Sequence, residues 1–576
     1  MEQTKLTGYP SIDKPWLKYY SEEAINAPLP ECTIYEYLWE NNKDHPDDIA
    51  IIYFNRKITY GELFQEIDNT AAALLGIGIK KGEIVTVAMP SIPEALYAVY
   101  ALNKIGAVAN MIHPLAGEQE LCNYLNEVES KVFLMFTGTY EIIKNVLKNT
   151  SVKTSVVVSP AQSLSPIYKC LYRIKTKETK IKNGSALLDW SAFLEKGRGV
   201  TAEKVEKNCH EMALISHTGG TTGEPKGCMI SNYNINAEIW QVGKTMYPVR
   251  QECMMAVLPP FINYGLTNGM FEPLAFGMKL VLIPKYDPMK FAAYVSEYQV
   301  NHINTIPAYC ESLLRIPRID KQNLSSIKNI VYGGEGMNDE LEQSINQVLK
   351  KCGCKYELKK GLGMTEATSA ASATVEGMNH TKSAGIPFPK MVITTVDPIT
   401  GKEIKYGTEG EICISGPTIM AGYFKKEQDT ADIIKEHSDG QRWLHTGDLG
   451  YIREDGVIYV TGRIKRIIMT KGNDGNITKI FPDRIEKVLL QHPAIDLCCV
   501  IGVKHDVRIH YPKAFVVLTD GFSDSETLTE EIKSFCKDKL PGYMIPDEIE
   551  YLPDLPRTSR GKIDYRALEE RAAKDA

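Results

Sequence analysis

The chain has 576 residues, more than one hydrophobic core usually supports, so at least two domains are expected. Hydrophobic residues make up 43% and charged residues 24%, as in ordinary globular proteins, and a net charge of −6 gives no reason to expect a nucleic-acid partner. The 13 cysteines are scattered without a Cys-x-x-Cys pair, which favours free thiols in a reducing compartment.

The first part of the chain alternates between predicted helices and strands. Its polar, proline-interrupted start lacks the apolar stretch of a signal peptide, and a first helix is expected near 33–41. Short strands at 50–54 and 57–60 precede a helix whose apolar residues recur at helical spacing. A buried strand at 84–89 and a further helix continue the alternation, which predicts an α/β domain. No uncharged apolar run approaches the length of a membrane span, so we expect a cytoplasmic protein.

Residues 160–207 interrupt this alternation of helices and strands and contain a basic stretch at 169–182. Lysines and arginines there are interspersed with Leu171, Tyr172 and Ile174. Such a stretch is typical of a solvated linker, but it can also lie against an anionic membrane or an acidic carrier protein. Both interpretations stay open.

A glycine-rich loop follows the expected buried strand at 212–215. Glycines let the backbone present N–H groups to an anion, while threonine hydroxyls and the charge of Lys226 would favour a polyphosphate. The predicted phosphate contacts, besides Lys226, are Thr218, Gly219, Gly220, Thr221, Thr222 and Gly223. A P-loop requires Gly-Lys followed by Ser or Thr, whereas Lys226 is followed by Gly227 and Cys228, which excludes that class.

The string from Ile215 to Gly227 closely resembles the phosphate-loop signature of adenylate-forming enzymes. These include acyl-CoA synthetases, peptide-synthetase adenylation domains and luciferases. The resemblance extends over nearly the whole chain, with six motifs in order, and is strongest to acyl-CoA synthetases such as fatty acid–CoA ligases. It implies a multidomain α/β protein. A large N-terminal α/β domain of layered sheets and helices would span 1–464, and a small mobile C-terminal α+β domain would span 465–576, with a hinge at Lys465.

Further motifs imply the nucleotide and metal contacts. In the segment Gly361-Leu362-Gly363-Met364-Thr365-Glu366, Thr365 would contact the α-phosphate and Glu366 would bind Mg²⁺, a hard cation that prefers oxygen ligands. Leu362 stands where the family usually has tyrosine, so the adenine would lose an aromatic stacking partner. The turn that would pass beside the adenine contains Gly333, Gly334, Glu335 and Gly336.

Two later segments imply the ribose contacts and the catalytic cation. Asp448 would accept both ribose hydroxyls, and Arg463 would reach ribose or phosphate. Lys562, in a terminal Gly-Lys motif, would hold the carboxylate and the α-phosphate while the acyl-adenylate forms. A mobile cation aimed at transition-state charge can contribute ~10²–10³ in rate. Strands at 500–503 and 514–518 are expected in this C-terminal part.

The acid-binding pocket is less well defined by the sequence. Asn263 falls where aryl-acid-activating members carry a substrate-reading asparagine, although it could equally be a structural hydrogen-bonder. No aspartate stands at Phe261 or Ile262 to hold an ammonium group, which disfavours amino acids as substrates. The regions of Ile306, Gly333 and Met337 would complete the pocket. We expect a fatty acid first and an aryl acid second.

The acceptor thiol also stays open. The segment between Gly472 and Pro482 is longer than is common in the family, where it helps form the pantetheine path. The expected protein is an ATP-dependent acid–thiol ligase using ATP, Mg²⁺ and CoA, with a carrier-protein phosphopantetheine as the alternative acceptor. A nucleotide-binding protein without turnover is a second alternative, and a purely structural role would leave the charged motif residues unexplained.

Overall fold

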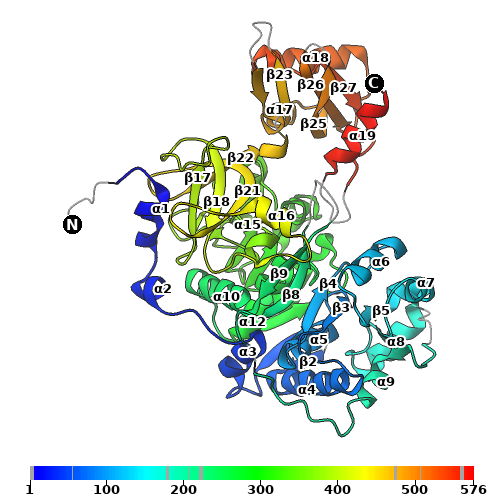
Figure 1. Cartoon of the computed structure of the whole chain (residues 1–576). Coiled ribbons are helices and arrows are strands. Elements are labelled where there is room, and N and C mark those ends of the chain that lie inside the picture. The colour runs from blue at the N-terminus through cyan, green and yellow to red at the C-terminus, as the bar shows by residue number, and fades with distance from the viewer. Residues whose placement is uncertain are drawn as a thin grey trace.

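The computed structural model describes residues 6–54, 56–176, 181–206, 208–218, 225–466, 468–471, 477–505, 508–557 and 563–575. Two large sheets with helices between and around them form most of the chain, followed by an antiparallel sheet and a small C-terminal unit (Figure 1). The last elements, from β23 (Ile468–Lys471) to α19 (Tyr565–Asp575), gather at one end of the molecule in Figure 1.

The eight-stranded sheet has the order β19-β9-β8-β4-β3-β5-β6-β7. Its neighbouring strands run parallel except at β9, which is antiparallel to both β8 and β19. The strands are β3 (Ile84–Ala88), β4 (Val108–Met111), β5 (Val132–Phe136), β6 (Thr154–Val158), β7 (Leu187–Asp189), β8 (Met212–His217), β9 (Gly227–Ser231) and β19 (Gly422–Tyr423).

The seven-stranded sheet has the order β14-β13-β12-β10-β11-β1-β2 and is parallel except for the β1–β2 hairpin. Its strands are β1 (Ile49–Tyr53), β2 (Arg56–Thr59), β10 (Cys253–Ala256), β11 (Lys279–Leu282), β12 (His302–Thr305), β13 (Asn329–Tyr332) and β14 (Lys359–Lys360).

The remaining sheets are smaller and mostly antiparallel. One sheet comprises β17 (Val392–Val396), β18 (Gly410–Ser415), β20 (Ile434–Glu436), β21 (Arg442–Ile452) and β22 (Ile458–Arg463). Two short strands, β15 (Ser372–Ala373) and β16 (Ile386–Pro387), pair with each other. The C-terminal unit contains the hairpin of β23 and β24 (Ile477–Ile480) and the sheet of β25 (Ile495–His505), β26 (Ile509–Leu518) and β27 (Glu548–Tyr551).

The helices of the first half are α1 (Pro10–Asp13), α2 (Glu22–Asn26), α3 (Ile34–Asn42), α4 (Tyr60–Gly76), α5 (Pro93–Lys104), α6 (Glu118–Glu127), α7 (Ile143–Lys148), α8 (Pro166–Thr176), α9 (Trp190–Glu195), α10 (Asn232–Met246), α11 (Asn263–Leu266) and α12 (Glu272–Ala275). Those of the second half are α13 (Phe291–Tyr298), α14 (Pro307–Glu311), α15 (Asp339–Lys351), α16 (Glu427–Ile433), α17 (Pro482–Leu489), α18 (Glu526–Lys537) and α19, with the short turns η7 (Thr365–Ala367) and η8 (Ile464–Arg466).

The main core lies between the two large sheets. Its largest cluster of buried side chains comes from strands of both sheets and from α3, α4, α5, α10 and α12. Three of these helices begin at capping boxes. At the starts of α3 and α4, Thr33 and Thr59 accept from the backbone N–H of Glu36 and Glu62 and those glutamates bond back, and α10 begins with the third box. These caps explain why the predicted helices start where they do.

The structure bears on the two interpretations left open for the basic stretch at 169–182. Its residues up to 176 belong to α8, a helix whose Tyr172 packs against the main core, and β7 further along the chain extends the eight-stranded sheet. The helix exposes Ile167, Leu171 and Ile174 at the spacing of one face. In the part of the chain that the structure describes, none of the helices combines the length and the apolar character needed to cross a bilayer.

Candidate active site

The glycine-rich loop is closed at its base by the strands on either side. His217 at the end of β8 pairs with Gly227 at the start of β9. Beyond that pair, the Thr218 N–H donates to the Lys226 carbonyl (2.9 Å) and the Lys226 N–H donates to Thr218 Oγ1 (3.1 Å). A Cβ at Gly227 would lie 2.8 Å from Ile215, so the strand pair requires glycine there. The predicted phosphate contacts Gly219, Gly220, Thr221, Thr222 and Gly223 lie outside the described residues.

Lys226 lies between an aromatic ring and a carboxylate. Its ammonium stands 5.0 Å from the centre of the Tyr423 ring on β19 and forms an ion pair with Asp429 on α16. Both charged side chains are partly exposed, so this pair is worth little to stability and can be exchanged for another anion. The geometry leaves Lys226 available for a phosphate.

Tyr423 links this lysine to the predicted metal ligand. Its hydroxyl donates to Glu366 Oε1 at 2.7 Å, and the Glu366 carbonyl accepts from the Met420 N–H at 2.9 Å. Burial, reinforced by the Glu366 carboxylate, raises the pKa of Tyr423 well above its ordinary value, so the phenol stays a donor. Nothing in the local sequence around Tyr423 signals this bond, because Glu366 lies 57 residues away.

The turn that carries Thr365 and Glu366 is supported by a buried network of hydrogen bonds. Glu238 on α10 accepts from the Ala370 N–H (2.9 Å) and the Asn268 amide (3.0 Å). Burial raises the pKa of Glu238 to about 8, against the opposing effect of those two donors. A protonated carboxyl therefore supports this turn near neutral pH. Nothing in the local sequence around Glu238 signalled that role.

Backbone strain marks the end of the same turn. Thr368 has φ of +66°, a conformation that β-branched residues rarely adopt. Its hydroxyl donates to the Thr418 carbonyl at 2.6 Å, and its own carbonyl accepts from the Asn263 amide. The other atom of that amide, Oδ1, accepts from Thr267 Oγ1 at 3.2 Å. Asn263 is thus buried and bonded on both sides within the protein, which favours its structural alternative.

Asp448 and Arg463 are paired across β21 and β22. Their Cα atoms are register partners, and Arg463 Nε lies 2.8 Å from Asp448 Oδ1. The carboxylate is nearly buried while half of the arginine side chain is exposed. Gly447 just before it has φ of +71°, and its N–H donates to Glu411. The structure therefore brings the two predicted ribose contacts together.

The turn after β13 and the segment after β14 supply the remaining predicted contacts. Gly334 has φ of +86°, and a Cβ at Gly333 would meet the Tyr264 ring at 3.6 Å. Glu335 and Gly336 are exposed, and Met337 packs against the apolar cluster of the seven-stranded sheet. The Leu362 N–H donates to Ser372 Oγ (2.9 Å), and its side chain packs against the cluster that contains Phe388. An apolar surface thus replaces the aromatic ring expected from the family.

The C-terminal predictions are only partly described. Lys562 lies outside the described residues, and of Lys465 the structure describes the backbone, within η8. The next residue, Arg466, is mostly buried and pairs with Asp483 (2.6 Å) and Glu486 on α17. Residues 472–476 of the long segment lie outside the described residues, and its remaining part contains β24 and the start of α17.

Comparisons with known proteins identify the family. The model of the AMP-binding enzyme family matches residues 38–424, and that of the AMP-binding enzyme C-terminal domain matches 484–562. The long-chain-fatty-acid–CoA ligase of Bacillus subtilis (strain 168) is 30% identical over 568 residues, covering 97% of this chain and 98% of that protein. The probable 4-coumarate–CoA ligase 1 of Dictyostelium discoideum is 27% identical over 562 residues, covering 96% and 97%.

Solved structures share the fold. The ATP-bound RpMatB-BxBclM chimera B1 gives a TM-score of 0.82 at 24% identity, covering 94% of this chain and 99% of that one. The anthranilate CoA ligase AuaEII in complex with anthranoyl-AMP gives 0.78 at 22% identity, covering 96% and 99%. The predicted fold class is confirmed, and the chain belongs to the AMP-binding enzyme family of adenylate-forming enzymes.

Proposed function

We propose that this protein is an ATP-dependent acid–thiol ligase that activates a fatty acid and transfers it to CoA. The observation that carries the proposal is that Tyr423, beside the base of the glycine-rich loop, contacts Lys226 with its ring and Glu366 with its hydroxyl. A cation suited to phosphate and a carboxylate suited to a metal therefore both contact the same side chain. Catalysis would consist mainly of positioning and charge stabilisation.

The reaction has two steps. A carboxylate oxygen of the acid attacks the α-phosphorus of ATP, the bond to the β-phosphate oxygen breaks, and pyrophosphate leaves with an acyl-adenylate formed. The sulfur of the thiol then attacks the acyl carbon, AMP leaves, and the thiol proton passes to solvent. Exclusion of water protects the mixed anhydride between the steps.

The chain's own residues divide this work. Lys226 and the glycine-rich loop would grip the polyphosphate, and Thr365 would contact the α-phosphate. Asp448 and Arg463, already paired, would exchange part of that pairing for the ribose. Lys562 would hold the acid's carboxylate against the α-phosphate in the first step.

Glu366 fits the role of a Mg²⁺ ligand. It is a partly buried carboxylate that forms no ion pair with any of the described cations. Tyr423 donates to one of its oxygens, which orients the group as hydrogen bonds to metal-binding carboxylates do. Mg²⁺, when bound there, would neutralise phosphate charge.

We further propose that residues 1–464 and 465–576 act as two domains that turn about Lys465 between the steps. The η8 turn contains Lys465, and Arg466 anchors the following chain to α17. Rotation would withdraw Lys562 and admit the thiol.

A fatty acid is favoured by the 30% identity to a ligase named for long-chain fatty acids over 97% of this chain. Aryl acids are the second candidate, because a relative named 4-coumarate–CoA ligase is 27% identical over a similar span. The hydrogen bonds of Asn263 within the protein weigh against its use as an aryl-acid reader.

The α8 helix supports peripheral contact with an anionic membrane, where a fatty acid would be found. Ile167, Leu171 and Ile174 are 72%, 57% and 70% exposed and lie four and three residues apart. Lys175 lies beside them and is also exposed. A protein that works from the cytoplasm would meet anionic lipid on that side.

The deciding experiment measures pyrophosphate release from ATP and Mg²⁺ with fatty, aryl and amino acids, each without thiol, with CoA, and with a phosphopantetheinylated carrier protein. We expect release with fatty acids and a thioester with CoA. Transfer only to the carrier protein would show that its phosphopantetheine, and not CoA, is the acceptor. ATP binding without pyrophosphate release from any acid would contradict the ligase proposal.

A further inference from the structure

Three potential metal ligands meet in the antiparallel sheet beside Asp448, and no step proposed above uses them. They are Cys413 on β18, His445 on β21 and His437 in the turn between β20 and β21. One ligand atom from each lies within 4.8 Å of the other two. We propose that this cluster binds a thiophilic divalent cation of the Zn²⁺ class.

The sheet register brings two of the ligands together. Cys413 and His445 are direct partners across the β18–β21 pair, so their side chains lie on one face. Cys413 is a fully buried free thiol and His445 is nearly buried. Both are therefore held in place by the sheet before any ion arrives.

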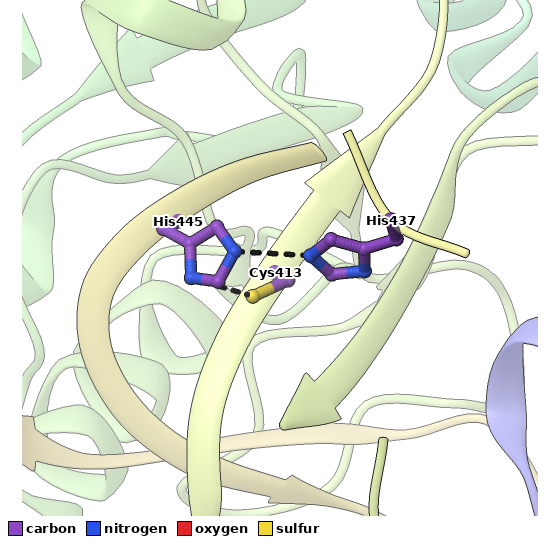
Figure 2. Close-up of side chains that lie close together, drawn as sticks. All are labelled: Cys413, His437 and His445. Atoms are coloured by element: carbon purple, nitrogen blue, oxygen red, sulfur yellow. Dashed lines mark hydrogen bonds between the residues drawn. The ribbon is translucent and has the colours of Figure 1, made fainter. Parts of the chain in front are cut away.

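The third ligand is oriented by its neighbours. The His437 ring stacks on the Trp443 indole with centroids 5.2 Å apart and planes 13° apart. The indole in turn donates to Asp439 at 3.1 Å, and His437 closes the turn by accepting from the Gly440 N–H. His437 Nε2 thereby lies 3.0 Å from His445 Nε2, facing it (Figure 2).

Glu411 fixes which nitrogen of His445 carries the proton. Its Oε2 lies 2.8 Å from His445 Nδ1, and a carboxylate can only accept there. The Nδ1 proton is then directed to Glu411, and the Nε2 lone pair points toward His437. A carboxylate behind a ligating imidazole is the common outer partner of protein-bound zinc.

The separations suit an ion after a small adjustment. Two nitrogens bound to Zn²⁺ at about 2.05 Å in tetrahedral geometry are about 3.3 Å apart. The observed 3.0 Å between the two Nε2 atoms requires an opening of a few tenths of an ångström. Figure 2 shows the Cys413 sulfur beside the His445 ring, 3.5 Å from Nδ1, so the sulfur must turn toward the Nε2 side of the ring to bind the same ion. A water could complete four-coordination on the partly exposed His437 side.

The donor set separates this site from the proposed Mg²⁺ ligand. One sulfur and two imidazole nitrogens suit Zn²⁺, Co²⁺ or Cu²⁺, whereas Mg²⁺ prefers oxygen. The cluster is also connected to the part of β21 that carries Asp448, because Glu411 Oε1 accepts from the N–H of the preceding residue, Gly447, at 3.0 Å. An ion bound there would link the β20–β21 turn to β18 and would hold Glu411 in place next to β21.

Cobalt titration of the chelator-treated full chain tests the proposal. We expect one Co²⁺ per chain, with the visible bands of a tetrahedral site, a sulfur-to-cobalt charge-transfer band, and displacement by Zn²⁺. Cys413→Ser should abolish the sulfur band. Glu411→Gln should weaken binding by about 10–100-fold, as for other outer partners, and loss of a direct ligand should weaken it further.

His437→Gln keeps the test valid even if Cys413→Ser fails to fold, because His437 lies in a partly exposed turn. A matched control is His210→Gln, which removes another histidine that packs on an aromatic ring, Tyr233. We expect binding to be lost in the first variant and kept in the second. Absence of the cobalt bands with excess ion, or bands that survive His437→Gln, would mean that the two histidines form only a hydrogen bond.

Discussion

The Tyr423 hydroxyl donates to the Glu366 carboxylate at 2.7 Å, while the face of the same ring meets the ammonium of Lys226. Tyr423→Phe keeps the ring and removes only the donor. A hydrogen bond to a charged group is worth about 1.5–3 kcal/mol, so we expect pyrophosphate release to slow by about 10–100-fold. Steady-state rates across Mg²⁺ concentrations would measure the change.

The matched control is Tyr406→Phe, which removes a phenol–carboxylate bond to Asp13 far along the chain. It should leave the rate close to that of the parent. Equal rates in Tyr423→Phe and the parent protein would show that Glu366 needs no orientation by this phenol.

Buried Glu238 should give stability a measurable pH dependence. Burial raises its pKa to about 8, so the folded protein keeps a proton that the unfolded chain loses above its ordinary pKa of 4.5. The contribution of this group to the free energy of unfolding is then fully present below about pH 4.5. It declines as pH rises toward 8, by at most about 1.4 kcal/mol per pH unit. Glu238→Gln removes that decline, because an amide carries no such proton.

Thermal unfolding scans between pH 5 and pH 8 would compare Glu238→Gln with the parent. The variant should gain melting temperature relative to the parent as pH rises, and the exposed control Glu376→Gln should not. Parallel curves for Glu238→Gln and the parent would mean that the carboxyl ionises without cost at this position.

The proposed hinge can be separated from the chemistry. Lys465→Pro fixes one backbone dihedral within η8, while Lys465→Ala leaves it free. We expect the proline variant to retain pyrophosphate release and to lose thioester formation by roughly tenfold or more, since only the second step requires rotation. Equal loss of both steps, or none, in a single-turnover comparison would contradict a hinge at this residue.

The exposed face of α8 predicts membrane binding. Placing a glutamate at Ile174 removes the burial of one large apolar side chain, worth about 1.5–3 kcal/mol, so partition onto anionic vesicles should fall by about 10–100-fold. Ile399→Glu, at a side chain 82% exposed elsewhere, is the control and should bind like the parent. Co-sedimentation with phosphatidylserine vesicles would measure both, and no binding by the parent would refute the contact.

Local patterns predicted much of this fold. The strand at 212–215, the helix after Thr59 and the alternation of the first half depend on neighbouring residues, and all are present. The contacts around Glu366 could not be predicted in this way. The bond from Ala370 to Glu238 spans 132 residues, and that from Tyr423 spans 57, so each depends on how distant elements pack. The sequence likewise left α8 ambiguous, because a basic amphipathic helix and a solvated linker have similar composition.

The bond between the Asn263 amide and the Thr368 carbonyl has a consequence for redesign. It couples the start of α11, which would border the bound acid, to the turn that carries Glu366. Changes that widen the acid site from the α11 side would therefore disturb the Glu366 carboxylate, the proposed metal ligand, as well. Altered substrate range should be easier to obtain from the opposite side, at Gly333 and Met337, where size can change without loosening that turn.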